Sequence, residues 1–275
     1  MDQVARYNIE RWQALAEADA LFTRPAFDLT PESAREMVDE ERLFGDLPGR
    51  DVLCLAGGGG QQSAAFALLG ANVTVFDLSD AQLERDRLAA AHYGVPVRTV
   101  QGDMRDLSAL NDAAFDLVFQ PYSLGFVPDA RAVFAEVARV LRPGGTYFFA
   151  IANPFYAGLT ESDWNGEGYT LKLPYTDGAE IVTADPDWVY TRSDSEPAPV
   201  PSCREYRQTL SKLMNSLIEL GFRLTHLSDS KHLNANFAAE PGSWDHRNAV
   251  APSWLAIWFE KESEARSQKS EEIRS

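Results

Sequence analysis

The chain has 275 residues, of which 45% are hydrophobic and 24% are charged, and its formal net charge is −16 at pH 7. This composition is typical of a soluble globular protein, and no apolar run reaches the ~20 residues of a membrane span. Because nucleic-acid binders neutralise phosphates with Lys and Arg, the negative charge disfavours a nucleic-acid substrate. No signal-peptide pattern opens the chain, so we expect a cytoplasmic protein. Cys54 and Cys203 indicate neither a disulfide framework nor a metal cluster.

Alternating strands and helices dominate the first half of the chain. Helices are predicted over residues 7–20 and 30–44, the second because Thr30-Pro31 is a typical helix start. Strands are then predicted at 51–56, 72–77, 97–101, 115–119 and 145–151, and helices at 62–69, 79–92 and 130–140. This alternation predicts an α/β protein with a doubly wound parallel sheet.

The alternating pattern stops at residue 153 for about fifty residues. We interpret residues 153–203 as an insertion that caps a substrate site. A helix over 204–220 and strands at 222–227 and 254–259 follow, and residues 261–275 form a charged tail that we expect to be disordered. The predicted organisation is therefore N-terminal helices that act as a lid (1–50), a cofactor-binding core (51–152), the insertion, the rest of the core sheet (204–260) and the tail.

The segment of residues 52–62, VLCLAGGGGQQ, runs a short apolar strand into four consecutive glycines. Glycines let the backbone turn sharply and approach a ligand, and the N-terminus of the next helix offers unpaired N–H groups. Asp77 ends the following strand, 21 residues after Ala56. A carboxylate at that place can accept both hydroxyls of a ribose. Together these features predict a site for a nucleotide-type cofactor.

The order of these motifs resembles that of the class I S-adenosylmethionine (SAM)-dependent methyltransferases. The first motif of that family is an acidic residue followed by three glycines at alternate positions, and here Cys54 and Ala56 replace the acid and the first glycine. The resemblance implies that Asp77 binds the ribose hydroxyls and that Leu78 packs on adenine. It also implies a Rossmann-like, seven-stranded sheet whose last strand is antiparallel, here with N-terminal helices and a cap insertion.

Two further segments carry the resemblance. Gly102-Asp103-Met104 resembles the family's Gly-Asp-x segment, in which the aspartate accepts from the adenine amino group, and residues 141–145, LRPGG, resemble the turn before the fifth strand. The implied cofactor is SAM, with S-adenosylhomocysteine (SAH) as its product. The cofactor-binding residues that we predict are Ala56, Gly57, Gly58, Gln62, Asp77, Leu78, Gly102, Asp103, Met104 and Gln120.

We therefore predict an enzyme that transfers a methyl group to oxygen or nitrogen of a small organic acceptor by in-line displacement. A non-catalytic SAM-binding or regulatory protein is an alternative, because Cys54 and Ala56 depart from the family pattern. An NAD-dependent oxidoreductase is another, but Gln61 stands where G-x-G-x-x-G needs its third glycine when counted from Ala56. An enzyme that methylates RNA or protein would need a basic groove beside the site.

The acceptor site is predicted from aromatic residues outside the core motifs. The insertion has nine acidic and two basic residues and seven aromatic ones (Phe155, Tyr156, Trp164, Tyr169, Tyr175, Trp188, Tyr190), which suits either a pocket for a flat or cationic acceptor or a solvated acidic loop. Tyr7 and Trp12 fit a lid or plain helix packing. The predicted substrate-binding residues are Tyr7, Trp12, Tyr122, Asn153 and Phe155, and the candidates for a general base are Tyr122, His226, His232 and His246, although a histidine is more often a packing or surface residue.

Overall fold

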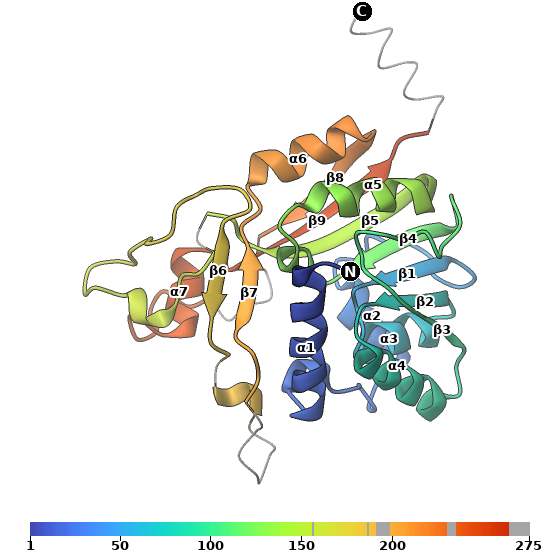
Figure 1. Ribbon diagram of the computed structural model, residues 1–275, viewed down its shortest axis with the longest axis horizontal. Helices are drawn as coiled ribbons and strands as arrows, with labels where there is room; N and C mark the ends of the chain where they lie inside the picture. The colour runs from blue at the N-terminus through green and yellow to red at the C-terminus, as the bar shows by residue number, and fades with distance from the viewer. Residues whose placement is uncertain (156, 186, 191–198, 230–234, 264–275) are drawn as a thin grey trace, which may run out of the picture.

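The main sheet of the protein has seven strands in the order β3-β2-β1-β4-β5-β9-β8 (Figure 1). The computed structural model describes residues 1–155, 157–185, 187–190, 199–229 and 235–263. Strands β1 to β5 pair in parallel, and β9 runs antiparallel between β5 and β8. The strands are β1 (Asp51–Leu55), β2 (Asn72–Asp77), β3 (Val97–Gln101), β4 (Phe115–Gln120), β5 (Leu141–Ala152), β8 (Phe222–Ser228) and β9 (Trp254–Lys261). The prediction of a doubly wound, seven-stranded sheet with an antiparallel last strand is confirmed.

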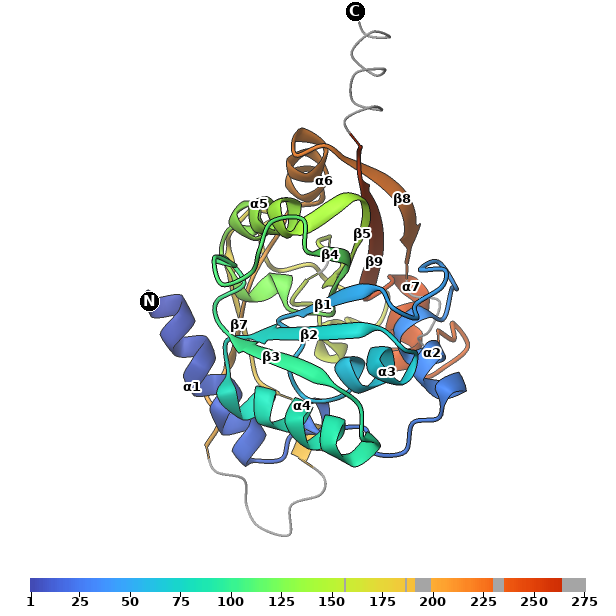
Figure 2. The ribbon, with the colours of Figure 1, turned by 90° about the vertical axis from the view of Figure 1, so that its right-hand side faces the viewer.

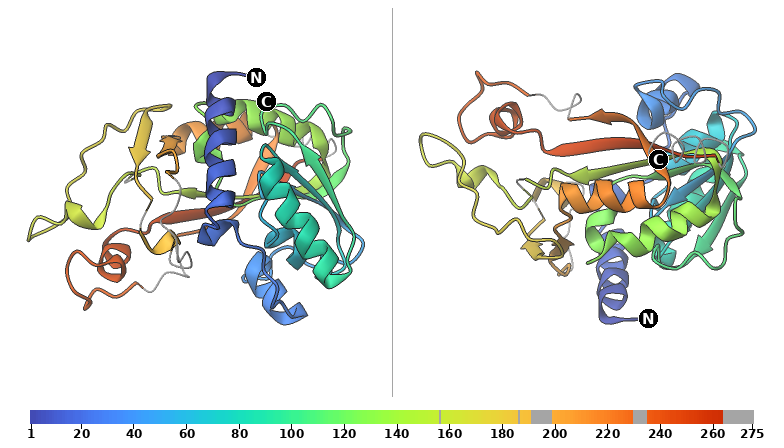
Figure 3. Two further views of the ribbon diagram at one scale, coloured as in Figure 1. Left: turned by 60° about the horizontal axis from the view of Figure 1, so that its bottom comes forward. Right: turned by 90° about the horizontal axis from the view of Figure 1, so that it is seen from above.

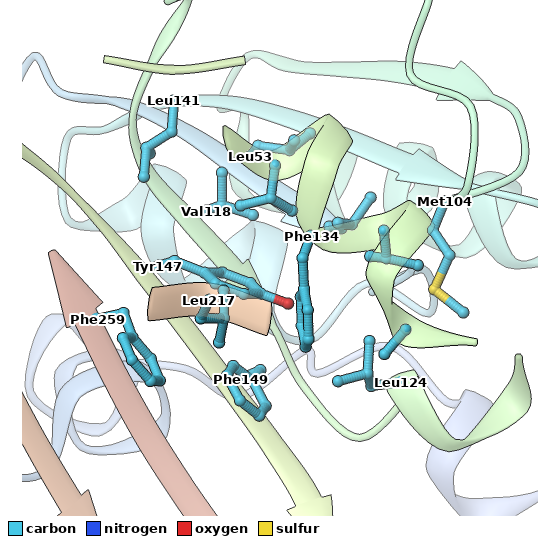
Figure 4. Packing of buried hydrophobic residues seen from close by; sticks show 14 of the residues in the cluster. Leu53, Met104, Val118, Leu124, Phe134, Leu141, Tyr147, Phe149, Leu217 and Phe259 are labelled. Carbon is cyan, nitrogen blue, oxygen red and sulfur yellow. The ribbon is translucent and has the colours of Figure 1, made fainter. Parts of the chain in front are cut away.

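Helices cover both faces of this sheet (Figure 2). Successive side chains of a strand point to opposite faces, so Leu53 of β1 packs on one side and Val52 on the other. The side of Leu53 is covered by α5 (Ala130–Val140) and α6 (Leu210–Glu219), and Figure 4 shows the cluster of buried side chains there. The side of Val52 is covered by α2 (Pro31–Asp39), α3 (Gln62–Leu68) and α4 (Asp80–Tyr93). Burial on both faces explains why the central strands are nearly continuous apolar runs.

Helix α1 (Gln3–Glu17) stands between the sheet and a smaller lobe (Figures 1 and 3). On the core side, Asn8 Nδ2 donates to the carbonyl of Phe126 at 3.0 Å. On the lobe side, the Arg11 guanidinium pairs with the Asp185 carboxylate at 2.6 Å. One helix therefore joins the two parts of the molecule. Short 3₁₀ turns lie at Leu21–Thr23, Leu124–Phe126, Glu161–Asp163 and Asp187–Tyr190.

The smaller lobe contains an antiparallel two-stranded ribbon and a short helix. The ribbon is formed by β6 (Glu180–Thr183) and β7 (Cys203–Tyr206), and the helix is α7 (Trp244–Val250), which the sequence analysis did not predict. Two separate stretches of chain meet here, because the Arg247 guanidinium donates to the carbonyl of Leu159 at 2.6 Å. The region predicted to cap the substrate site is thus joined by residues that directly precede β9.

The helix predicted over residues 204–220 is wrong in its first part. Residues Cys203–Tyr206 form strand β7, in which Glu205 pairs with Ile181 of β6, and α6 begins only at Leu210. Local sequence does not reveal this pairing, because β6 lies more than twenty residues upstream. At the other end, Lys261 belongs to β9, and residues 264–275 of the predicted tail lie outside the described part of the chain. No helix in the described part is long and apolar enough to cross a membrane.

Candidate active site

The glycine loop after β1 turns back on itself and is held from helix α4. Ala56, Gly59 and Gly60 have φ values of 45°, 124° and 77°. The Asp86 carboxylate accepts from the backbone N–H groups of Gly59 and Gly60, each at 3.1 Å, and from the Ser63 hydroxyl. Burial raises the pKa of Asp86 to about 7. The sequence analysis missed Asp86. Its only sign in the sequence is that a charged residue lies on the helix face that packs against the protein, and this does not by itself indicate a site.

Asp77 lies at the end of β2, directly beside this loop. Its carboxylate accepts from the backbone N–H of Gly58 at 3.0 Å and from that of Ser79 at 2.8 Å. A Cβ on Gly58 would lie 3.0 Å from Asp77 Oδ2, so the absence of a side chain there permits the close approach. Burial raises the pKa of Asp77. The glycine loop and Asp77, which the sequence analysis assigned to one site, are thus in direct contact.

A cavity opens where the loop, β2, the turn after β3 and helix α1 meet. It contains six of the predicted cofactor-binding residues: Ala56, Gly58, Asp77, Leu78, Asp103 and Met104. Gly102 lies beside it, and a Cβ there would clash with the ring of Phe76 at 2.2 Å. The other residues around this first cavity include Ala5, Asn8 and Trp12 of α1, Gln82 of α4, and Ser123, Phe126 and Val127 after β4.

Asp103 does not present a free carboxylate to this cavity. Arg105 Nε lies 3.0 and 3.1 Å from its two oxygens, and Arg105 Nη2 lies 2.6 Å from Oδ2. The same guanidinium reaches Asp2 at 2.6 Å, and Asp2 is the N-cap of α1. Two ion pairs that share Arg105, with Asp2 and with Asp103, therefore tie the start of the predicted lid to the turn after β3.

Gln120 faces the protein core rather than the cavity. Its side chain is fully buried, with Oε1 accepting from the Tyr147 hydroxyl at 2.5 Å and Nε2 donating to the Ser123 hydroxyl at 3.0 Å. Its amide is therefore not available to a ligand, and only its backbone could serve the predicted role. Gly57 and Gln62, the two remaining predicted residues, line a second cavity.

The second cavity adjoins the first. Both cavities are lined by Trp12, Ala56, Gly58, Tyr122 and Phe126, so they form two compartments of one cleft. The remaining walls come from segments that are far apart in the sequence: Arg11, Phe22, Gly57, Gln61, Gln62, Pro121, Asp185, Val189, Cys203, Glu205 and Trp254. Among the predicted substrate-binding residues, Trp12 and Tyr122 are the two in this cavity.

Tyr122 and Glu205 form a hydrogen-bonded pair in the wall of the second cavity. The Tyr122 hydroxyl donates to Glu205 Oε1 at 2.6 Å, and burial raises the pKa of Glu205. The Tyr122 ring packs edge-on against Trp254, with centroids 4.1 Å apart. Glu205 was missed because the sequence analysis placed it on a helix. A half-buried carboxylate paired with a phenol can accept a proton from a bound ligand.

Three predicted substrate-binding residues lie away from the cleft. The Tyr7 hydroxyl donates to the carbonyl of Ser202 at 2.8 Å, which ties α1 to the lobe. Asn153 forms a turn in which Oδ1 accepts from the backbone N–H of Phe155 at 3.1 Å. Phe155 is 56% exposed and stacks on Tyr175 with centroids 5.4 Å apart. The aromatic wall of the cleft is therefore built by Trp12, Phe22, Tyr122, Phe126 and Trp254. Of the insertion aromatics whose side chains are described (Phe155, Trp164, Tyr169, Tyr175, Tyr190), none is among its lining residues.

The candidate histidines lie in packing or surface positions. His226 Nε2 is 2.9 Å from the Glu41 carboxylate on the side of β8, and His246 packs among aromatic rings of the lobe, 5.1 Å from Trp164 between centroids. Neither lines either cavity. His232 and Tyr156 lie outside the described residues. The interpretation of His226 and His246 as packing or surface residues fits these contacts.

The sheet order, the glycine loop and the cleft at the carboxyl ends of β1, β2 and β4 define a Rossmann-like protein that binds a nucleoside cofactor. A methyltransferase domain family matches residues 53–149. The chain is 34% identical over 188 residues to the uncharacterized methyltransferase YbaJ of Bacillus subtilis, covering 68% of this chain and 71% of that protein. The chain belongs to the class I SAM-dependent methyltransferases, and SAM is its cofactor.

Other similar proteins agree with this assignment. The ubiquinone biosynthesis O-methyltransferase of Pseudomonas syringae pv. tomato is 34% identical over 157 residues, which cover 56% of this chain and 66% of that protein. A putative SAM-dependent methyltransferase from Listeria monocytogenes shares the fold, with a TM-score of 0.62 and 18% identity over 84% of this chain and 99% of that one. The predicted enzyme class is confirmed, and neither an oxidoreductase nor a non-catalytic protein is supported.

The residues of the first cavity fit this cofactor. A carboxylate, Asp77, suits a ribose, and the apolar Leu78 and Met104 suit a purine ring. The amide of Gln82 is buried in the wall, and neither of its polar atoms has a hydrogen-bond partner within the described part of the chain. A native protein rarely leaves such a group unsatisfied, so this amide indicates a polar ligand in the cavity.

Proposed function

We propose that this enzyme transfers the methyl group to an oxygen or nitrogen atom of a small, flat organic acceptor bound in the second cavity. The observation that carries the proposal is that the two cavities are neighbours, since Trp12, Tyr122 and Phe126 line both of them. When bound, SAM supplies an electrophilic methyl group on a sulfonium. The surrounding protein has to hold the acceptor in line, exclude water and take up a proton.

Aromatic side chains and an excess of acidic groups, Asp185 and Glu205 against Arg11, favour a neutral or cationic acceptor. Asp185 pairs with Arg11, whereas Glu205 is hydrogen-bonded only by a neutral phenol among the contacts found for its side chain. Burial raises the pKa of the Cys203 thiol to about 11, so this thiol is uncharged at neutral pH. Neither Lys nor His is among the residues that line the cavity. An anionic acceptor would be repelled, and a flat cation would be attracted to the rings.

The Tyr122–Glu205 pair supports an acceptor that loses a proton on methylation. Glu205 would hold the proton of an O–H or N–H group, directly or through the Tyr122 hydroxyl, which can accept from the ligand while it donates to Glu205. The relatives named ubiquinone biosynthesis O-methyltransferases favour oxygen over nitrogen. One of them, from Cronobacter sakazakii, matches over 45% of its length, so its acceptor is not carried over.

A methyl-transfer screen tests this proposal. Purified protein is incubated with isotopically labelled SAM and three matched sets of aromatic acceptors: neutral phenols, aromatic amines and ring-carboxylated phenols. We expect labelled product from the neutral or cationic sets, with the methyl group on oxygen or nitrogen by mass spectrometry. Preferential turnover of the carboxylated set, or methylation of carbon, would contradict the proposal.

We also propose that Asp77 holds the ribose. Replacing it by Ala is expected to weaken SAH binding by about 1–3 kcal/mol, because charge-assisted hydrogen bonds to the hydroxyls are lost. Isothermal titration calorimetry measures the effect, and circular dichroism checks folding, since Asp77 also anchors Gly58. Asp80→Ala is the matched control, because Asp80 lies nearby on α4 with a side chain that is 66% exposed. An unchanged dissociation constant in folded Asp77→Ala protein would refute the ribose role.

Helix α1 is proposed to act as the lid that the sequence analysis predicted. Asp2→Ala removes the N-cap bond to the backbone N–H of Ala5 and the ion pair with Arg105. We expect SAH to dissociate about 2- to 5-fold faster in a stopped-flow experiment, the scale of one cap and one exposed ion pair. Glu10→Ala, on the exposed side of the same helix, serves as the control. Equal dissociation rates for Asp2→Ala and the wild type would argue against a lid.

A further inference from the structure

Gln82 of α4 has a buried amide that nothing in the described part of the chain satisfies. The residue is 2% exposed, and neither Oε1 nor Nε2 has a hydrogen-bond partner there. Its backbone, by contrast, is fully used, because the N–H donates to the Ser79 hydroxyl at 3.4 Å and the carbonyl accepts from the N–H of Gly59 at 3.2 Å. A buried amide without partners destabilises the ligand-free protein.

The side chain of Gln82 lies against the glycine loop together with Asp77. A Cβ on Gly58 would be 2.7 Å from Gln82 Cβ and 3.0 Å from Asp77 Oδ2. Gln82 Oε1 lies 3.2 Å from the place that a Cβ on Gly59 would occupy. Both Gln82 and Asp77 line the first cavity. The two residues therefore stand together against Gly58 in the same stretch of its wall.

Their hydrogen-bonding capacities are complementary for a vicinal diol. An ionised carboxylate only accepts, whereas each hydroxyl of a diol both donates and accepts. A diol that gives its protons to Asp77 keeps oxygen lone pairs that need a donor, and Gln82 Nε2 supplies two N–H groups. We propose that Gln82 is a second ribose-binding residue, whose amide donates to a ribose hydroxyl of SAM beside Asp77. This assignment does not depend on the acceptor, but it rests on the proposed ribose role of Asp77, which the Asp77→Ala variant tests separately.

Gln82→Met tests the proposal, because Met has a similar shape but no amide. We expect the dissociation constant for SAH, measured by calorimetry, to rise about 3- to 13-fold, the scale of one hydrogen bond. The melting temperature of the ligand-free variant is expected to rise by about 2 to 4 °C, because an unsatisfied buried group is removed. These opposite directions distinguish a ligand contact from a structural role, since loss of a structural residue would lower the melting temperature as well.

A second ligand isolates the hydroxyl. The 2′,3′-dideoxy analogue of SAH cannot make the proposed bond, so Gln82→Met is expected to change its dissociation constant less than about twofold. The assignment would be overturned if Gln82→Met lost affinity equally for SAH and for the dideoxy analogue. An unchanged dissociation constant for SAH would overturn it as well. Gln82→Leu carries the same expectations, should the Met variant not fold.

Gln208 offers a matched control for the melting-temperature measurement. It is 3% exposed, but its Nε2 donates to the carbonyl of Val127 at 2.7 Å. Gln208→Met removes a satisfied amide and leaves that carbonyl without its donor. Its melting temperature is therefore expected to fall, in contrast to that of Gln82→Met. A fall in both variants would show that Gln82 stabilises the ligand-free fold and would count against the proposal.

Discussion

Replacing Glu205 by Gln is expected to lower kcat about 100-fold or more while the dissociation constant for SAH stays within about twofold. Gln keeps the shape and can still accept from the Tyr122 hydroxyl, but it cannot take up a proton from the acceptor. Glu205 lines only the second cavity, so the cofactor compartment is not altered. Turnover is measured with the best acceptor from the screen.

The pH dependence of kcat gives a second readout. Because burial raises the pKa of Glu205, kcat is expected to rise with pH, with an apparent pKa above the usual range of Glu. This rising part of the pH profile is expected to be absent in Glu205→Gln. Tyr122→Phe removes a hydrogen bond that favours the charged form of Glu205, so the rising part of its pH profile is expected to move to higher pH. Glu180→Gln, on the exposed neighbouring strand β6, is the matched control. A Glu205→Gln enzyme with wild-type kcat would eliminate Glu205 as the base.

Replacing Asp86 by Asn is expected to change how the stability of the protein depends on pH. The pKa of Asp86 is raised to about 7 in the folded state, so the folded protein binds this proton more tightly than the unfolded chain does. The stability that Asp86 contributes is therefore fully present below pH ~4 and falls as the pH rises towards 7. In wild type, this residue alone is expected to lower the free energy of unfolding by about 3 kcal/mol between pH 5 and pH 8.

The side-chain amide of the Asp86→Asn variant would not titrate, but it would leave one loop N–H facing an amide nitrogen. Since Gly59 and Gly60 each donate to a different oxygen of Asp86, the variant is expected to lose about 1–3 kcal/mol at pH 5, where wild type is most stable, and to approach or exceed wild type at pH 8. Urea unfolding at both pH values measures this difference. Asp80→Asn on the same helix is the control, because its carboxylate is 66% exposed. If the free energy of unfolding changed equally between pH 5 and pH 8 in wild type and in Asp86→Asn, the prediction would be contradicted.

The grouping of the glycine loop, Asp77 and the Gly102 turn could be predicted because it follows the order of the chain. The glycine loop, Asp77 and the Gly102 turn are ends of successive strands, and parallel strands bring such ends to one edge of the sheet. What could not be predicted there is which side chains complete the site. Asp86 and Gln82 are ordinary polar residues of a helix in sequence, and only the packing of α4 on the loop gives them their contacts.

The walls of the second cavity, where we propose that the acceptor binds, could not be predicted in this way. Phe155 was predicted to line it from aromatic content alone, yet this residue stacks on Tyr175 at the surface of the lobe. Glu205 was assigned to a helix because residues 204–220 have a helical apolar pattern in their second part. The pairing of β7 with β6 is a long-range contact that local periodicity does not encode. Trp12 and Tyr122 were predicted because they lie near the core motifs in sequence or on an amphipathic helix.

The sequence by itself determined the alternation of strands and helices and hence the parallel sheet, because these patterns are local properties of the chain. Its resemblance to a known family implied the seven strands and the enzyme class. Only the tertiary structure decided the second cavity, since its walls join residues as distant as Arg11, Glu205 and Trp254. Such walls form when α1 and the lobe bury surface against each other, and that burial depends on the whole fold rather than on any one segment.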